Sequence, residues 1–111
     1  MLIVKKDNYT LITMNESSVK EFHHSFVKEI ESQEKKHLIL DFSESFNTSI
    51  KEILLFLNIA NDYRKNGISF VIICSGLNID SIPDEINIAP TMTEALDVLE
   101  MDMIERDLMN F

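Results

Sequence analysis

Blocks of apolar residues alternate with polar blocks along the chain, and their lengths predict strands and helices in turn. Two extended segments, residues 2–4 and 9–14, flank a turn-forming Asp-Asn pair and predict an opening hairpin. Residues 37–42 and 68–74 are aliphatic runs between polar segments, as strands buried on both faces are. A shorter run at residues 86–89 precedes a proline and predicts one more strand. We place residues 37–42 at the centre of the sheet.

Helices are expected between these strands, because three segments open with a Ser or Thr followed three residues later by Glu. The pairs are Ser18 and Glu21, Ser49 and Glu52, and Thr91 and Glu94. In such a capping box the two side chains bind the free backbone N–H groups of the first helical turn. The three helices are expected to end near residues 30, 65 and 99. The pattern predicts an α/β fold with a mixed sheet of four to five strands, largely parallel after the hairpin.

The second helix, residues 50–65, has more apolar positions than one buried face requires. One stripe is expected to face the sheet, and it consists of Ile50, Ile53, Leu54, Leu57 and Ala60. A second stripe is expected to turn away from the sheet, and it consists of Leu55, Phe56, Ile59 and Tyr63. The second stripe then has to be buried by another element, a second copy of the chain or a partner.

Charge is concentrated at the C-terminal end of the chain. The 111 residues carry a net charge of −9, and the segment from Asp84 onward holds eight acids against one base, Arg106. Such a surface repels nucleic acid and anionic lipid, so neither is expected as a partner. It suits a basic protein surface, although a solvated helix face explains the same pattern.

Length and composition fit one domain of about residues 1–99 followed by an acidic and apolar tail, residues 100–111. In the tail, Ile104, Leu108 and Phe111 are apolar among acids. Such a stretch either docks on its own domain, where it would cover the Leu55 stripe, or binds another molecule.

A reducing, cytoplasmic setting is expected for the chain. Residues 1–5 are too short for the apolar region of a signal peptide, and residues 53–57 are far too short for a membrane span. The lone cysteine, Cys74, ends a predicted strand and is most simply a small core residue.

Residues 37–74 resemble the STAS domain, which occurs in bacterial anti-sigma-factor antagonists and in the cytoplasmic tails of sulfate transporters. That family reads Leu-Asp-Leu-Ser at the end of a strand, then Asp-Ser-Ser-Gly-Leu at a helix start, then Gly before the next strand. Here LILDFS at residues 38–43 matches the first part, SIKEI at residues 49–53 falls on the second, and Gly67 on the third. PTMTEAL at residues 90–96 is similar to the start of the family's last helix. The resemblance implies a regulatory domain that binds proteins, with the second helix in the partner-facing surface.

The resemblance fails at the family's regulatory serine. In phospho-regulated members the second serine of the motif receives a phosphate from a partner kinase, and that position is Lys51 in this chain. A shifted alignment would place Thr48 or Ser49 there, but helix capping already explains Ser49. The usual phosphorylation switch is therefore not expected.

No catalytic, metal or cofactor site is expected. The chain also resembles short bacterial proteins labelled ribonuclease Z, yet it has no histidine-rich ligand string, and two glycines are too few for a phosphate-binding loop. One alternative stays open: Asp41, Ser43 and Ser75 follow strands and could form a small-molecule or hydrolytic site.

The favoured function is therefore protein binding without catalysis, and a homodimer through the Leu55 stripe is a further alternative. The residues expected at the partner surface are Ser49, Lys51, Glu52, Leu55, Phe56, Ile59, Tyr63, Ile104, Leu108 and Phe111.

Overall fold

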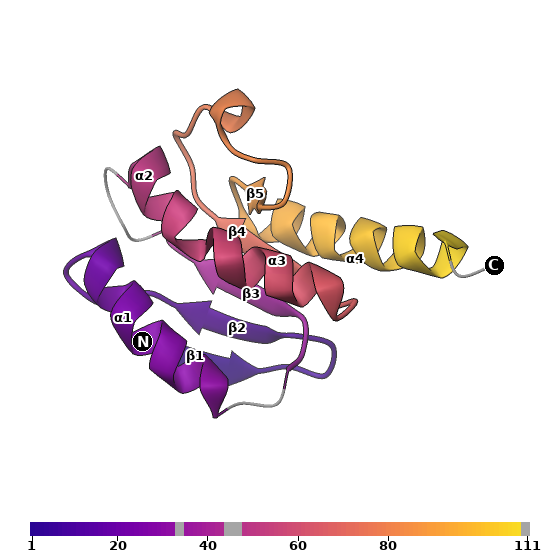
Figure 1. The fold of residues 1–111 in the computed structure, drawn as a ribbon, viewed down its shortest axis with the longest axis horizontal. Helices are drawn as coiled ribbons and strands as arrows, with labels where there is room; N and C mark the ends of the chain where they lie inside the picture. Colours follow the sequence, from indigo (N-terminus) through magenta and orange to yellow (C-terminus); the bar gives the residue numbers. More distant parts are fainter. Residues whose placement is uncertain (33–34, 44–47, 110–111) are drawn as a thin grey trace.

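The computed structural model describes residues 1–32, 35–43 and 48–109 (Figure 1). The strands are β1 (Leu2–Lys5), β2 (Thr10–Thr13), β3 (Leu38–Asp41), β4 (Phe70–Ile73) and β5 (Asn87–Ala89). The α-helices are α1 (Val19–Glu31), α2 (Ile50–Ile53), α3 (Leu57–Lys65) and α4 (Met92–Met109), and the 3₁₀ turns are η1 (Leu54–Phe56) and η2 (Ile79–Ser81).

The five strands form one mixed sheet in the order β1-β2-β3-β4-β5. β1 and β2 are antiparallel, and every later neighbour is parallel, as the alternation of strands and helices predicts. The opening hairpin and the central place of β3 are confirmed. β4 is the most completely buried strand, because all four of its residues are buried, and three of the four residues of β3 are buried as well. The expected α/β fold class is thus the observed one.

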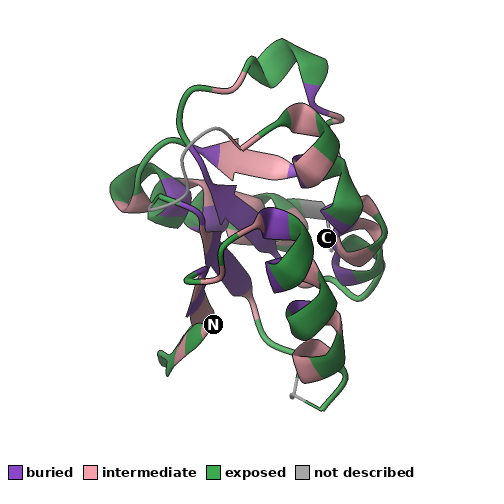
Figure 2. Ribbon diagram, turned by 90° about the vertical axis from the view of Figure 1, so that its left-hand side faces the viewer, coloured by how far each residue is buried: buried purple, intermediate pink, exposed green. Residues whose placement is uncertain are grey.

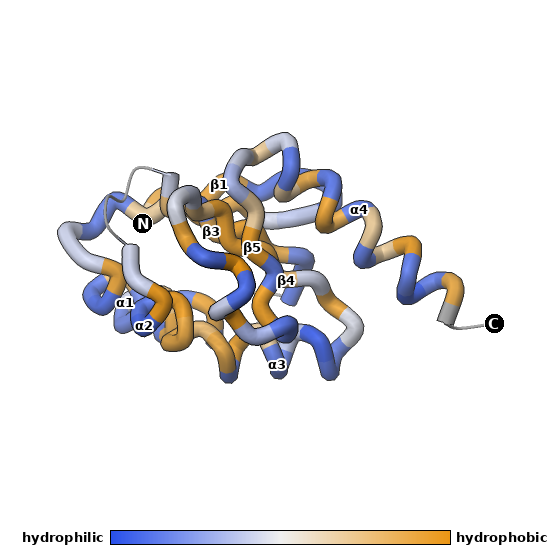
Figure 3. The backbone as a smooth tube through the Cα atoms, turned by 90° about the horizontal axis from the view of Figure 1, so that it is seen from above, coloured by the Kyte–Doolittle hydropathy of each residue, from blue (hydrophilic) through white to orange (hydrophobic). Residues whose placement is uncertain are grey.

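Helices cover the two faces of the sheet unequally, because α1, α2 and α3 lie on one face and α4 lies on the other (Figure 3). Ile12, Leu40 and Ile72 point to the first face and belong to the larger cluster of buried side chains. On the second face, Ile39 and Val71 belong to a smaller cluster that includes residues of α4. Figure 2 shows the buried residues concentrated in the strands and on the inner sides of the helices. The sheet therefore separates two hydrophobic cores and contributes side chains to both.

Aromatic rings fill the larger core. Phe56 lies 6.1 Å from Phe22, 5.8 Å from Phe26 and 5.6 Å from Phe42, measured between ring centroids. All four rings are almost completely excluded from solvent. Contacts at these distances add to the free energy gained from burying the ring surfaces.

The second helix is not continuous, contrary to the prediction. It begins at Ile50, tightens into η1 and resumes as α3 from Leu57 to Lys65. The change coincides with Phe56, whose φ of −94° and ψ of 3° leave the regular helical region. The segment also ends where expected, because Gly67 takes a φ of +70° that suits glycine after a helix.

The last helix is longer than predicted. Its expected end was Leu99, but α4 continues without a break to Met109. Its start is as expected, since the Thr91 hydroxyl accepts the N–H of Glu94 at 3.2 Å. Most of the segment expected to be a separate tail is therefore the second half of a helix.

Candidate protein-binding surface

The start of α2 is held by a complete capping box. The Ser49 hydroxyl accepts the N–H of Glu52 at 3.2 Å, and the Ser49 N–H donates to the Glu52 carboxylate at 2.9 Å. The Ser49 hydroxyl also donates to the same carboxylate at 3.1 Å. The hydroxyl is therefore both acceptor and donor within the cap, as expected if Ser49 serves to start the helix.

An exposed face runs along α2, η1 and the start of α3. Lys51, Leu54, Leu55 and Asn58 are exposed, and they follow one another at spacings that place them on one side of a helix. We call these four residues the α2–η1 patch. Leu54 and Leu55 are 39% and 40% exposed, so the middle of the patch is apolar and its ends are polar. Two adjacent half-exposed leucines between polar residues are a surface that a protein partner can cover.

The predicted two-stripe arrangement is wrong for three residues. Phe56 and Tyr63, expected to turn away from the sheet, are 0% and 2% exposed, whereas Leu54, expected to face it, is exposed. The inward line of the helix passes through Ile53, Phe56, Ala60 and Tyr63. Burying two aromatic rings removes more apolar surface from water than burying Leu54 would. Phe56 and Tyr63 therefore belong to the core and not to a partner surface.

The other residues predicted for the interface on this segment differ in their exposure to solvent. Ser49 and Lys51 are exposed, while Glu52 and Ile59 are partly buried. Ile59 packs against the larger core cluster, and Glu52 is held by the Ser49 cap. These residues thus lie in or beside the α2–η1 patch, but of them only Ser49, Lys51 and Leu55 are exposed.

A histidine that the sequence did not single out as an interface residue lies beside the patch. The His23 ring, on α1, meets Phe56 edge to face with centroids 5.0 Å apart. Burial lowers the pKa of His23 below its usual 6.5, a hydrogen bond with the backbone of Leu55 opposes this, and the charge of His24 adds to it. His23 is therefore biased toward its neutral form and links α1 to η1.

The lone thiol lies on the inner side of the cap. Cys74 is buried, and its burial raises the pKa of the thiol. A hydrogen bond with Thr48 opposes the rise, and the charge of Glu52 adds to it. A protonated, buried thiol is a poor nucleophile, so Cys74 has the character of a core residue.

The second half of α4 does not cover the α2–η1 patch, because α4 lies on the opposite face of the sheet (Figure 3). Ile104 and Leu108 are 51% and 65% exposed. Phe111 lies outside the described residues. The sequence raised the possibility that the tail folds back over the Leu55 stripe, and for the described part of α4 this is wrong.

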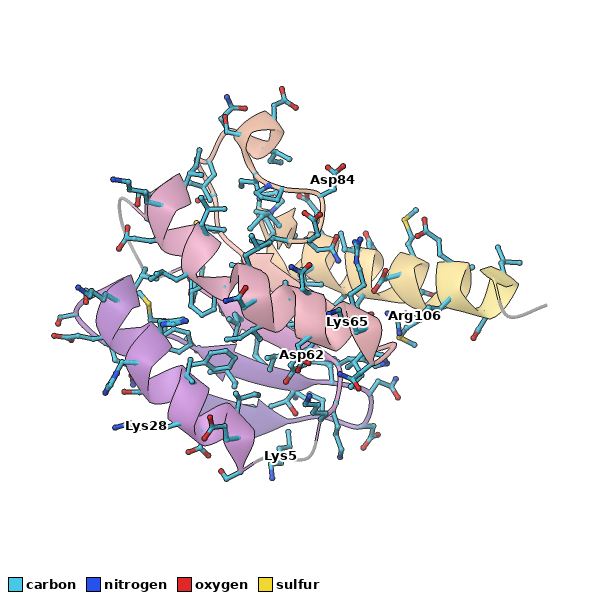
Figure 4. All side chains as sticks on the ribbon, in the orientation of Figure 1. Lys5, Lys28, Asp62, Lys65, Asp84 and Arg106 are labelled. Carbon is cyan, nitrogen blue, oxygen red and sulfur yellow. The ribbon has the colours of Figure 1, made fainter. Side chains whose placement is uncertain are left out.

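One polar cluster, missed at the level of sequence, holds α4 against the sheet. The Arg106 guanidinium donates to the carbonyl of Gly67, to the hydroxyl of Ser69 and to the carboxylate of Asp102. The Ser69 hydroxyl donates to Asp102, and its N–H donates to Nδ1 of His37 at 3.0 Å. Figure 4 shows Arg106 where α4 passes the end of α3. The spacing of four residues between Asp102 and Arg106 is typical of a helical ion pair, but the helix was expected to end near residue 99, and the contact with Ser69 has no local signal.

The alternative site at the strand ends is only partly described. Asp41 accepts the N–H of Ser43 at 2.8 Å, which makes a local turn, and Ser43 and Ser75 are exposed. The intervening loop at residues 44–47 lies outside the described residues. A cavity of about 330 Å³ lies near the opposite ends of β4 and β5, where Phe70, Asn87 and Arg106 are among its lining residues.

Within the described ranges, no group of three His, Cys, Asp or Glu side chains is placed to hold a metal ion. No helix in the described part of the chain combines the length and apolar character that a membrane span needs.

Two solved structures share this fold. A serine-to-glutamate variant of RsbS from Moorella thermoacetica is 21% identical, with a TM-score of 0.60 over 90% of this chain and 94% of that chain. A structure titled as the molecular architecture of the stressosome, a signal integration and transduction hub, has a TM-score of 0.55 at 20% identity over 90% of this chain and 96% of that chain. No family model matches the sequence, and no curated protein is similar to it. The structural matches establish a STAS-like fold.

Proposed function

We propose that this protein is a non-catalytic regulatory module of STAS-like type that binds a protein partner through the α2–η1 patch. The observation that carries the proposal is the pair of half-exposed leucines, Leu54 and Leu55, between the exposed polar residues Lys51 and Asn58. The fold shared with RsbS and with a signal transduction hub supports a role in signalling. The lone buried cysteine fits a reducing, cytoplasmic setting.

The partner surface in this proposal differs from the predicted one. Ser49, Lys51 and Leu55 remain in it, Leu54 joins it, and Glu52 and Ile59 lie at its border. Phe56 and Tyr63 leave it because they are buried. The two leucines supply the apolar centre, and Lys51 and Asn58 supply the polar rim, which is the usual arrangement of a protein interface.

We also propose that the module works without the family's phosphoserine. By the alignment on LILDFS and SIKEI, the regulatory position is Lys51. The nearest hydroxyl on α2, that of Ser49, accepts one hydrogen bond and donates another inside the cap. Phosphorylation of Ser49 would remove the O–H that donates to Glu52 and would place phosphate charge beside that carboxylate, so it would disrupt this half of the cap.

The binding proposal is tested by capture from native cell extract, with wild type compared to a Leu54→Gln/Leu55→Gln double variant. Gln favours helix and removes apolar surface, so the fold should be kept while capture of the specific partner falls at least about tenfold. Leu2→Thr is the matched control, because Leu2 is 57% exposed on β1 and lies outside the patch. Equal capture by the double variant and the wild type contradicts the proposal.

Two further measurements address the finer parts of the proposal. After incubation with extract and ATP, mass spectrometry should find residues 48–51 unmodified, and stoichiometric phosphate on Thr48 or Ser49 would contradict the loss of the switch. Sedimentation at several concentrations tests self-association. A dimer that Leu55→Glu abolishes would show that the patch binds a second copy in place of a different partner.

A further inference from the structure

α4 has apolar side chains on two opposite sides. Ala95 and Leu99 are buried against the sheet. Met101, Ile104 and Leu108 are 63%, 51% and 65% exposed. At about 100° per residue, these three lie on the side of the helix opposite Leu99. We call them the outer stripe.

The outer stripe lies where α4 projects past the rest of the molecule. Figures 1 and 3 show the second half of α4 extending beyond the sheet toward the C-terminus. Single exposed apolar residues are common on protein surfaces, but three in register along a helix form a continuous strip. The spacing of three and then four residues is the one by which amphipathic helices present anchors to a groove.

Carboxylates surround the outer stripe. Five exposed acids lie on this side of α4 or at its flanks, namely Glu94, Asp97, Glu100, Glu105 and Asp107. The only base of α4 is Arg106, and it is directed to the opposite side, where it binds Gly67, Ser69 and Asp102. The outer side of the helix therefore presents an apolar strip inside an acidic border.

This border limits what the stripe can bind. A second copy of the chain would bring the same five carboxylates together from both helices, and opposed like charges are costly at an interface. Phosphate groups of nucleic acid or anionic lipid would meet the same repulsion. An apolar groove edged by Lys or Arg fits both features, because the groove buries the apolar strip and its positive charges pair with the surrounding carboxylates.

We propose that the outer stripe of α4 docks in a basic-edged apolar groove of another protein. This inference rests on the proposed function as a binding module, but it assigns the basic partner to a different surface. The α2–η1 patch and the outer stripe lie on opposite faces of the sheet (Figure 3). One molecule is thus built to hold two partners at once and to bridge them.

The hydrogen bonds of Arg106 to Gly67, Ser69 and Asp102, which we call the Arg106 clamp, give the outer stripe a defined position. Without it, the projecting half of α4 would be tied to the body mainly through Leu99 and Met103, which belong to or pack on the smaller core cluster. Arg106 adds hydrogen bonds to the carbonyl before Ile68 and to the Ser69 hydroxyl, close to the start of β4. A helix held in one orientation loses less conformational entropy on binding than a free tail does.

The test uses two synthetic amphipathic peptides as probes, each with a leucine strip, one with lysine flanks and the other with glutamate flanks. Each is titrated into the isotope-labelled full chain while backbone amide shifts are followed. The lysine peptide should shift amides of residues 97–108 and weaken about tenfold or more as salt rises from about 0.05 M to about 0.5 M, because exposed charge pairs are screened. The glutamate peptide should leave these amides unchanged.

Variants separate this inference from its alternatives. Ile104→Gln/Leu108→Gln should weaken the lysine peptide at least about tenfold, whereas Leu96→Gln, on another side of the same helix, should not. Binding of both peptides alike, or shifts centred on the α2–η1 patch, overturns the proposal. A dimer that the double variant dissolves also overturns it. The Leu54→Gln/Leu55→Gln variant should bind the lysine peptide normally, so failure of the patch and failure of the stripe are distinguishable.

Discussion

The guanidinium of Arg106 donates a hydrogen bond to the hydroxyl of Ser69, which lies 37 residues earlier in the chain. Ser69 is 2% exposed and immediately precedes β4. The contact joins the outer half of α4 to the start of a central strand. Because Arg106 also binds Asp102 one helical turn away, the bond fixes the rotation of the helix about its own axis.

Replacing Arg106 with Gln should loosen the second half of α4 more than the rest of the fold. Hydrogen bonds to a charged group contribute about 1.5–3 kcal/mol net, and solvent screens the exposed part of this cluster, so the free energy of unfolding should fall by about 2 kcal/mol in total. Amide hydrogen exchange should speed up most at residues 100–109. If amide exchange speeds up equally in α4 and in the strands, the contacts of Arg106 have no local effect on the second half of α4.

Replacing Tyr63 with Phe should leave the protein as stable or make it more stable by about 1 kcal/mol, because an unpaired buried hydroxyl is costly. Among the described residues, the Tyr63 hydroxyl has no hydrogen-bond partner. Burial raises the pKa of Tyr63 to about 12, and the neighbouring charge of Asp62 adds to the rise. Urea unfolding checks the prediction, and a loss above about 1 kcal/mol would mean that a buried water satisfies the hydroxyl.

Ser49→Ala should destabilise the protein by about 1 kcal/mol, because it removes the acceptor of the Glu52 N–H. Ser49→Asp is the matched variant, since aspartate caps helices as well as serine does and also resembles a phosphoserine. Thermal unfolding should therefore show a loss for alanine and little change for aspartate. If both variants are equally destabilised, the hydroxyl itself and not the cap acceptor is required.

Acidification from about pH 7.5 to about pH 5.5 should lower the free energy of unfolding. Burial lowers the pKa of both His23 and His37 below 6.5, and for His37 the charge of Arg106 adds to this while Asp102 opposes it. Below 6.5 the unfolded chain binds protons that the folded chain does not, so stability is lost as the pH falls toward the folded pKa values.

The histidine variants check that prediction. His23→Gln/His37→Asn should flatten the dependence of urea unfolding on pH, and Asn at position 37 keeps an acceptor for the Ser69 N–H. Ser25→Gln is the control, because Ser25 is exposed on the same helix as His23 and carries no group that titrates in this pH range. If the free energy of unfolding depends on pH as strongly in the double variant as in the wild type, the two histidines are not its source.

Features that depend on near neighbours in sequence were predictable. The Ser49 and Glu52 cap involves residues three apart, and β3 and β4 are short aliphatic runs that any buried parallel strand requires. These signals are local, so they place the cap and the two buried strands along the chain without reference to distant contacts.

Features that depend on distant contacts were not predictable. Which side of the second helix faces inward is decided by the rings of Phe22, Phe26 and Phe42, which surround Phe56 only after the chain has folded. The extension of α4 past Leu99 is likewise held by Arg106 and its contact with Ser69. Periodicity alone could not rank Phe56 above Leu54, because both positions are apolar and neighbouring.

The order of the strands leaves two unpaired edges, and both discourage sheet extension. β5 has three residues and is followed by Pro90, which has no N–H to offer a further strand. β1 ends at Lys5, and Lys6 follows, so repeated positive charge disfavours pairing of this edge with another copy. The fold therefore resists edge-to-edge aggregation while leaving its helix surfaces open to other proteins.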